Sequence, residues 1–178
     1  MENKFGGHIR PKKEIAFGID CILQPVYVVS LEVFRRGLLT RPEYKHYQAV
    51  VDGGTGKVEF FPSGSIHVMS GLPFDGKMLP VLIGSTEAEA LAEMAARQSG
   101  RGGWKSFLSS IHAFAATQKT ISTWRIWIAS GDKLIDSVTE KEINVGVFLA
   151  QFLSGESNCL PLEEDQDLYF DDKTPDDG

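Results

Sequence analysis

Apolar and polar residues alternate along the first third of the chain with a period of two, which is typical of half-buried strands. The alternation covers residues 26–34 and 46–52, and a glycine-rich turn at residues 52–56 leads into a third stretch at 57–61. This pattern predicts an antiparallel sheet whose last two strands form a hairpin. We expect its covered face to carry Tyr27, Val29, Val51, Val58 and Phe60.

Apolar residues at helical spacing predict three helices. The first begins at the capping box of Thr86 and Glu89 and ends before residues 99–100, and the second covers residues 104–115. A second hairpin joins strands at 123–129 and 134–138. The third helix begins at the capping box of Thr139 and Glu142 and ends at Gly155. We therefore expect an α+β fold in which an antiparallel sheet has helices packed on one face.

Charge divides the chain into a body and an acidic tail. The chain has a formal net charge of −6, and residues 162–178 hold eight acidic side chains against Lys173 alone. Removing the −7 of this tail from the −6 of the chain leaves +1 for residues 1–161. We expect one domain over residues 1–161 with a basic N-terminal arm, followed by the acidic tail at 162–178. A nearly neutral body argues against a highly basic nucleic-acid surface or a membrane-surface domain.

Cysteine usage and hydropathy bear on location. Cys21 and Cys159 are far apart and lie in no CxxC pair, so neither a zinc ribbon nor a disulfide framework is indicated. The N-terminus has no signal-peptide core, and no apolar run approaches the roughly 20 residues that cross a bilayer. These patterns predict a cytoplasmic protein in a reducing compartment with no membrane partner.

Motifs that carry chemistry are not found. The run from Gly53 to Lys57 lacks the spacing of a phosphate loop and lies between two strands. The four histidines occur in none of the usual metal-ligand or catalytic spacings, and there is no Gly-x-Ser-x-Gly elbow. We therefore expect no catalytic residue, no cofactor and no metal.

The polar face of the predicted sheet leaves an alternative open. His46 and His67 share it with Gln48, Glu32 and Glu59. Such a set suits a ligand site or a small hydrolase, whereas a polar sheet face is more often simply solvated.

Two aromatic and basic clusters suggest a further alternative, a single-stranded nucleic-acid-binding protein. Trp104 is followed by Lys105, and Arg125 lies between Trp124 and Trp127. Bases stack on aromatic rings while lysine and arginine follow the phosphates. The competing interpretation places Trp104 in the apolar stripe of a helix and Trp124 in the core. Only Trp127 and Arg125 then remain on the opposite face.

The acidic tail contains three adjacent large apolar residues, Leu168, Tyr169 and Phe170. An apolar anchor among acidic residues suits docking onto a basic surface with an apolar groove, although a tail of this composition also serves solubility. The sequence thus predicts a non-catalytic protein that binds a protein partner. Its expected contact residues are Leu168, Tyr169, Phe170, His46 and His67.

The first hairpin also resembles that of a known family. Residues 26–29, followed by residues 47–58 with an Asp at position 52 and a Thr-Gly turn at 55–56, resemble the strand hairpin of PepSY-type domains. This likeness covers about a fifth of the chain. The resemblance implies a small binding or inhibitory module, of a family that is often exported.

Overall fold

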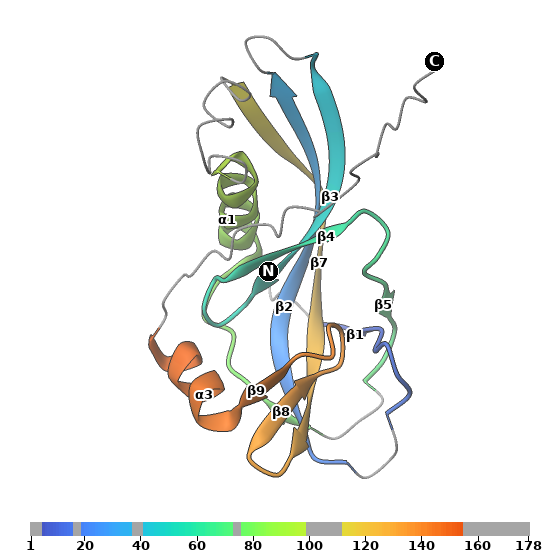
Figure 1. Cartoon of the computed structure of the whole chain (residues 1–178), viewed down its shortest axis with the longest axis vertical. Coiled ribbons are helices and arrows are strands. Elements are labelled where there is room, and N and C mark those ends of the chain that lie inside the picture. The colour runs from blue at the N-terminus through green and yellow to red at the C-terminus, as the bar shows by residue number, and fades with distance from the viewer. Residues whose placement is uncertain (1–4, 16–18, 37–40, 73–75, 99–111, 155–178) are drawn as a thin grey trace, which may run out of the picture.

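The computed structural model describes residues 5–15, 19–36, 41–72, 76–98 and 112–154 (Figure 1). Its strands are β1 (His8–Ile9), β2 (Cys21–Arg36), β3 (Glu43–Asp52), β4 (Val58–Pro62), β5 (Val68–Met69), β6 (Lys77–Met78), β7 (His112–Ser130), β8 (Lys133–Asp136) and β9 (Glu142–Asn144). The helices are α1 (Ser85–Gln98) and α3 (Val145–Ser154).

The strands of the described residues form one mixed, mostly antiparallel sheet that curls into a half-barrel (Figure 1). Its order is β4-β3-β2-β7-β1-β5, with β6 beside β2 and the β8-β9 pair beside β7. The long strands β2 and β7 form its centre, and their register shifts between Ser30 and Leu31. Such a bulge bends the strand and increases its twist, which helps the sheet to curl. The predicted strands at 26–34, 46–52 and 57–61 and the second hairpin are confirmed.

One side of the sheet, called the first face, is covered by α1. Tyr27, Val29, Leu31 and Val33 of β2 project to this face and are buried. The helix contributes four buried alanines, at positions 88, 92, 95 and 96, whose small side chains let it lie close to the strands. Figure 1 shows α1 alongside the long strands. Burial of Tyr27, Val29, Val51 and Val58 is as predicted, and Phe60 is partly buried against the same cluster.

The opposite side, called the second face, is closed over part of its length, which the sequence did not lead us to expect. Val28 and Val50 pair across β2 and β3 and are each 2% exposed. They pack with Ile9, Ile66 and Val138, which come from β1 and from connecting segments. The strands are therefore buried on both faces here. The expectation of one covered and one open face holds only farther along the sheet.

The predicted helix at 104–115 is wrong at its C-terminal end, where residues 112–115 belong to β7. Residues 104–111 lie outside the described part of the chain. Pairing with β2 continues to the first residue of β7, where His112 lies opposite Arg36. Long-range strand pairing thus overrides the local helical spacing.

The last helix begins later than the capping box predicts. Glu142 lies in β9, and Thr139 hydrogen-bonds the carboxylate of Asp136 instead of capping a helix. The N-cap is Asn144, whose Oδ1 accepts the N–H of Gly146 at 2.8 Å. The predicted end at Gly155 lies outside the described residues.

Helix α3 packs on the second face of the sheet, so the two helices do not share one face. The ring of Phe148 lies 4.9 Å from the ring of Trp127. Trp127 pairs with Ile22, two positions before Gln24 on the row that carries Val26 and Val28. The fold is α+β, as predicted, with the helices packed against the sheet at different places. Neither helix of the described residues is long and apolar enough to cross a membrane.

Candidate interaction surface

Three aromatic side chains lie side by side on the second face, near one end of the sheet. The register places Phe34 of β2 opposite Tyr44 of β3 and opposite Phe114 of β7. The ring centroids of Phe34 and Tyr44 are 4.8 Å apart. Tyr44 is 66% exposed and Phe114 is 63% exposed. Clustered exposed rings of this kind are typical of binding surfaces, because their contact with water is unfavourable.

The aromatic side chains border a hollow in the sheet surface. It has a volume of about 350 Å³ and is lined by Phe34, Tyr44, Phe114, Ala116 and Glu32. Ala116 lies opposite Glu32 in the register, and its small side chain leaves space beside Phe114. We call these five residues the aromatic groove. Its volume is at the lower end of the roughly 300–1,000 Å³ that small-ligand pockets occupy.

The segment around Ile66 that covers the second face ends beside Gln48, next to the aromatic groove. The side-chain amide of Gln48 donates to the backbone oxygen of Ile66 at 3.1 Å and accepts from its N–H at 2.9 Å. This pair of bonds fixes the covering segment over β3. His46 and Tyr44 follow Gln48 on the same row, and both are exposed.

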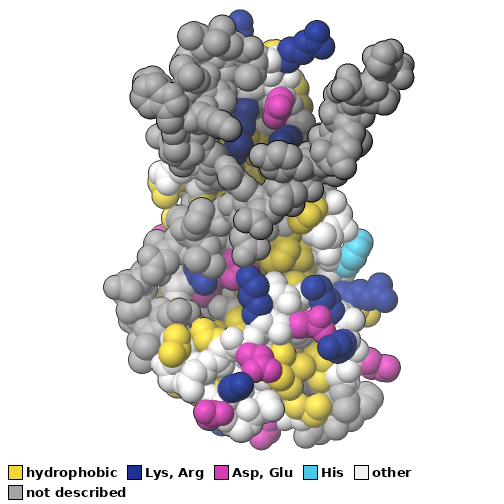
Figure 2. Space-filling view, viewed as in Figure 1, with side chains coloured by type: hydrophobic (Ala, Val, Ile, Leu, Met, Phe, Trp, Pro, Cys, Tyr) yellow, Lys and Arg dark blue, Asp and Glu magenta, His cyan; other side chains and the backbone are white. Residues whose placement is uncertain are grey.

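Basic residues outnumber acidic residues around the aromatic groove. Over residues 31–36, 41–48 and 112–119, the charged side chains are Arg35, Arg36, Arg41, Lys45 and Lys119 against Glu32 and Glu43. Arg36 and Lys119 are exposed on the row of the groove itself. Figure 2 shows Lys and Arg side chains at this end of the molecule. Arg35, Lys45 and Glu43 alternate to the first face, so on the second face Arg36 and Lys119 outnumber Glu32, which favours an anionic ligand.

The two histidines proposed as contact residues lie in different surroundings. His46 is exposed, lies opposite Glu32, and is next to Tyr44 on its row, so it belongs to the border of the aromatic groove. His67 is exposed in the segment before β5, where its backbone oxygen accepts the N–H of Arg10 at 2.8 Å.

The polar residues that suggested a ligand or hydrolase site, other than the two histidines, each bind a different partner within the protein. Gln48 is bonded to the covering segment, Glu32 accepts from Gln118 at 3.0 Å, and Glu59 accepts from Arg125 at 2.9 Å. Among the described residues, no group of three or more His, Cys, Asp or Glu is arranged to hold a metal ion.

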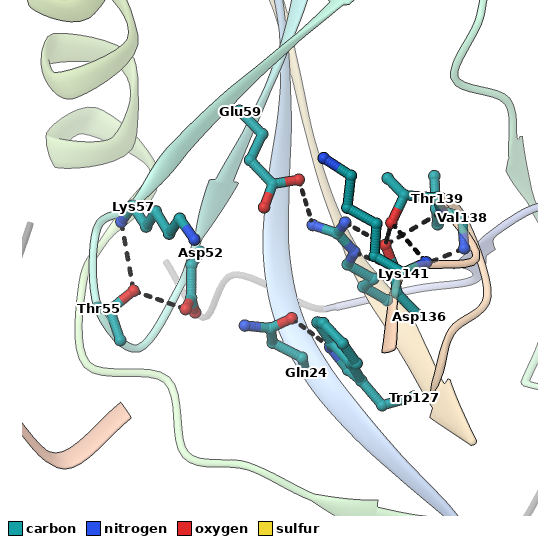
Figure 3. Close-up of polar contacts among 11 residues, drawn as sticks. Gln24, Asp52, Thr55, Lys57, Glu59, Trp127, Asp136, Val138, Thr139 and Lys141 are labelled. Atoms are coloured by element: carbon teal, nitrogen blue, oxygen red, sulfur yellow. Dashed lines mark hydrogen bonds and ion pairs between the residues drawn. The ribbon is translucent and has the colours of Figure 1, made fainter. Parts of the chain in front are cut away.

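Arg125 is the centre of a buried ion-pair network (Figure 3). Its Nε and Nη2 donate to the two carboxylate oxygens of Asp136 at 2.9 and 2.5 Å, and Nη1 donates to Glu59. Asp136 also accepts the backbone N–H groups of Val138 and Thr139 and the Thr139 hydroxyl. The network ties β8 and the following turn to β7 and β4.

Burial and ion pairing shift the pKa values of Arg125 and Asp136 in opposite directions. Burial alone would lower the pKa of Arg125, but hydrogen bonds and charges from Asp136 and Glu59 outweigh it and raise that pKa. Burial alone would raise the pKa of Asp136, whereas Arg125, Thr139 and Val138 lower it below its usual value. Both side chains are therefore held in their charged forms.

The residues of the predicted nucleic-acid cluster that the structure describes are engaged within the fold. Each of the three guanidinium nitrogens of Arg125 donates a hydrogen bond, and the guanidinium lies 5.5 Å from the centre of the Trp127 ring. Trp127 donates its ring N–H to Gln24 at 2.6 Å and packs on Phe148. Trp104 and Lys105 lie outside the described residues, as do Leu168, Tyr169 and Phe170.

The glycine-rich turn is a hairpin turn, as predicted. The N–H of Gly54 donates to the carboxylate of Asp52 at 2.8 Å. The hydroxyl of Thr55 donates to the same carboxylate at 2.6 Å (Figure 3). The acidic side chain thus occupies the donors that a phosphate would need.

Comparisons of the chain with protein-family models, with curated proteins and with solved structures found no match. The resemblance to PepSY-type domains therefore rests on the hairpin alone.

Proposed function

We propose that this protein is a non-catalytic binding module whose aromatic groove docks a peptide segment of a partner protein. The observation that carries the proposal is the row of Phe34, Tyr44 and Phe114 left uncovered beside a closed part of the same sheet face. Full burial of a Phe-sized side chain contributes about 1.5–3 kcal/mol. Covering Tyr44 and Phe114 would therefore supply a substantial part of a micromolar affinity, which corresponds to about 8 kcal/mol.

The surroundings of the aromatic groove define the chemistry of the segment. Its apolar lining suits one or two large apolar side chains, and the positive excess around it suits acidic flanking residues. We therefore propose a partner segment with an aromatic or aliphatic anchor between Asp and Glu residues.

A single-stranded nucleic acid suits the same surface less well. One side of the Phe34 ring is occupied by Tyr44, whose ring centroid lies 4.8 Å away. Stacking of successive bases needs open ring faces in a positively charged channel.

Fluorescence anisotropy with labelled probes tests the proposal. The probes are a short peptide with two aromatic residues flanked by Asp and Glu, the same peptide with Ser at the aromatic positions, and oligothymidine. We expect the aromatic acidic peptide to bind, and Phe114→Ser to weaken it about tenfold, the equivalent of about 1.4 kcal/mol. Leu82→Ser is the matched control, because Leu82 is likewise 63% exposed but lies away from the groove.

Two results would contradict the proposal. Equal loss of binding in the Phe114 and Leu82 variants would show that the peptide does not use the aromatic groove. Tighter binding of oligothymidine than of the peptide would instead identify a nucleic-acid-binding protein.

A further inference from the structure

We propose that the aromatic groove also receives a segment of its own chain, Leu168-Tyr169-Phe170, so that the free protein masks its docking site. This inference rests on the proposed function, since it names the regulation of the same groove. It makes the acidic tail an internal competitor of the partner segment.

The chemistry of the tail matches that of the aromatic groove. The tail places three adjacent large apolar residues among eight acidic ones and carries a net charge of −7. On the second face, this end of β2, β3 and β7 presents exposed rings together with the exposed side chains of Arg36 and Lys119. The apolar residues would remove the rings of Tyr44 and Phe114 from water, and the acidic residues would face Arg36 and Lys119.

The chain is long enough for this contact. Helix α3 lies against Trp127, which is paired with Ile22, and Phe34 lies twelve residues farther along β2. At about 3.3 Å per residue this separation is at most about 40 Å. Ser154, the last residue of α3, lies six residues beyond Phe148, about 9 Å along the helix, so it is at most about 50 Å from the groove. The fourteen steps from Ser154 to Leu168 span about 46–50 Å when the chain is extended.

Connection through the chain gives the tail an advantage over a free peptide. Because the tail is tethered, its local concentration at the groove does not depend on the protein concentration. An effective concentration about ten times the intrinsic dissociation constant of the tail would reduce the apparent affinity for a competing peptide about tenfold.

The test compares two full-length proteins, the wild type and a Leu168→Ser/Tyr169→Ser/Phe170→Ser variant. The probe is a labelled synthetic peptide of residues 163–173, titrated by anisotropy at low and high salt. We expect the variant to bind the probe about tenfold more tightly than the wild type, and the difference to shrink as salt screens the charges. A Leu160→Ser/Leu162→Ser protein is the matched control, because it makes the same chemical change outside the motif and should bind like the wild type.

The outcomes separate this inference from the proposed function. Binding of equal strength to wild type and triple variant would leave the groove a peptide site and overturn its occupation by the tail. No binding to either protein, or binding to the triple variant that Phe114→Ser leaves unchanged, would overturn both. A concentration-dependent doubling of mass that disappears in the triple variant would show that the tail occupies the groove of a second copy instead.

Discussion

Replacing Arg125 with methionine is expected to produce a large loss of stability. Arg125 is 5% exposed and Asp136 is fully buried, so the substitution leaves a carboxylate inside the protein without its cationic partner. Removing one partner of a buried ion pair costs about 3–5 kcal/mol. Because Val138 and Thr139 still donate to Asp136, we expect a value near the lower limit, about 3 kcal/mol.

Urea and thermal unfolding, followed by circular dichroism, measure this loss. At roughly 2–4 °C per kcal/mol for a chain of this size, the midpoint should fall by about 6–12 °C. Lys133→Met is the matched control, since Lys133 pairs with Glu142 at 2.8 Å but the two side chains are 56% and 53% exposed. Exposed pairs contribute little, so the control should leave the unfolding midpoint nearly unchanged.

The pH dependence tests the reasoning behind this number. In the wild type the pKa of Asp136 is lowered below 3.8, so its contribution is present at neutral pH and is lost as the pH falls through the folded-state pKa. In the Arg125→Met protein burial is no longer offset by the cation, so the pKa of Asp136 should be higher. As the pH falls, Asp136 is therefore protonated in the variant at a higher pH than in the wild type, and the cost of its buried charge disappears. The difference in stability between the two proteins should narrow on acidification. A loss below 1 kcal/mol, or a difference that does not change with pH, would refute this account of the network.

Three further substitutions test local features of the fold by the same unfolding measurements. Gly53→Ala should cost about 1–3 kcal/mol, because its Cβ would lie 2.9 Å from the carbonyl oxygen of Pro25, whereas Gly84→Ala has nothing within 4 Å and should be nearly neutral; equal effects would contradict the close approach. Asn144→Ala should cost about 1 kcal/mol through loss of the α3 cap, and an unchanged midpoint would place the cap elsewhere. Tyr27→Phe should cost about 1–2 kcal/mol, because the hydroxyl donates to a loop carbonyl at 2.7 Å inside the core; a neutral result would mean that water satisfies that carbonyl.

The strands of the first half could be predicted because their alternation is local. Tyr27, Val29 and Val51 alternate with their neighbours, and burial of this row follows from the period alone. The neighbours Val28 and Val50 are also apolar, and this was the available sign that the second face is covered there. What covers it could not be predicted, because Ile9 and Val138 lie far away in the sequence.

The error at residues 112–115 has a different origin. Phe114, Ala115 and Ala116 follow one another without clear alternation, so an apolar stripe at helical spacing fitted them as well as a strand did. Their conformation is decided by pairing with β2, about 80 residues earlier in the chain. Local propensity carries no record of such a partner.

The aromatic groove was missed for the same reason. Phe34 ends the strand predicted at 26–34, and Tyr44 lies two residues before the strand predicted at 46–52. Phe114 lies in the segment assigned to a helix. Only the register of β2 with β3 and β7 places the three rings together. The positive excess was equally hidden, because the charge of +1 for residues 1–161 averages it against acidic residues elsewhere.

The division of the second face into a closed and an open part allows binding and stability to be tested separately. Phe114 is 63% exposed, whereas Phe148, on the closed part, is 5% exposed and packs on Trp127. Removal of an exposed ring loses little buried area, and removal of a buried one leaves a cavity. Phe114→Ser should therefore retain the unfolding midpoint of the wild type, while Phe148→Ser lowers it. A loss of peptide affinity in the Phe114 variant can then be attributed to the aromatic groove itself, since the network around Arg125 and the clusters on both faces remain intact.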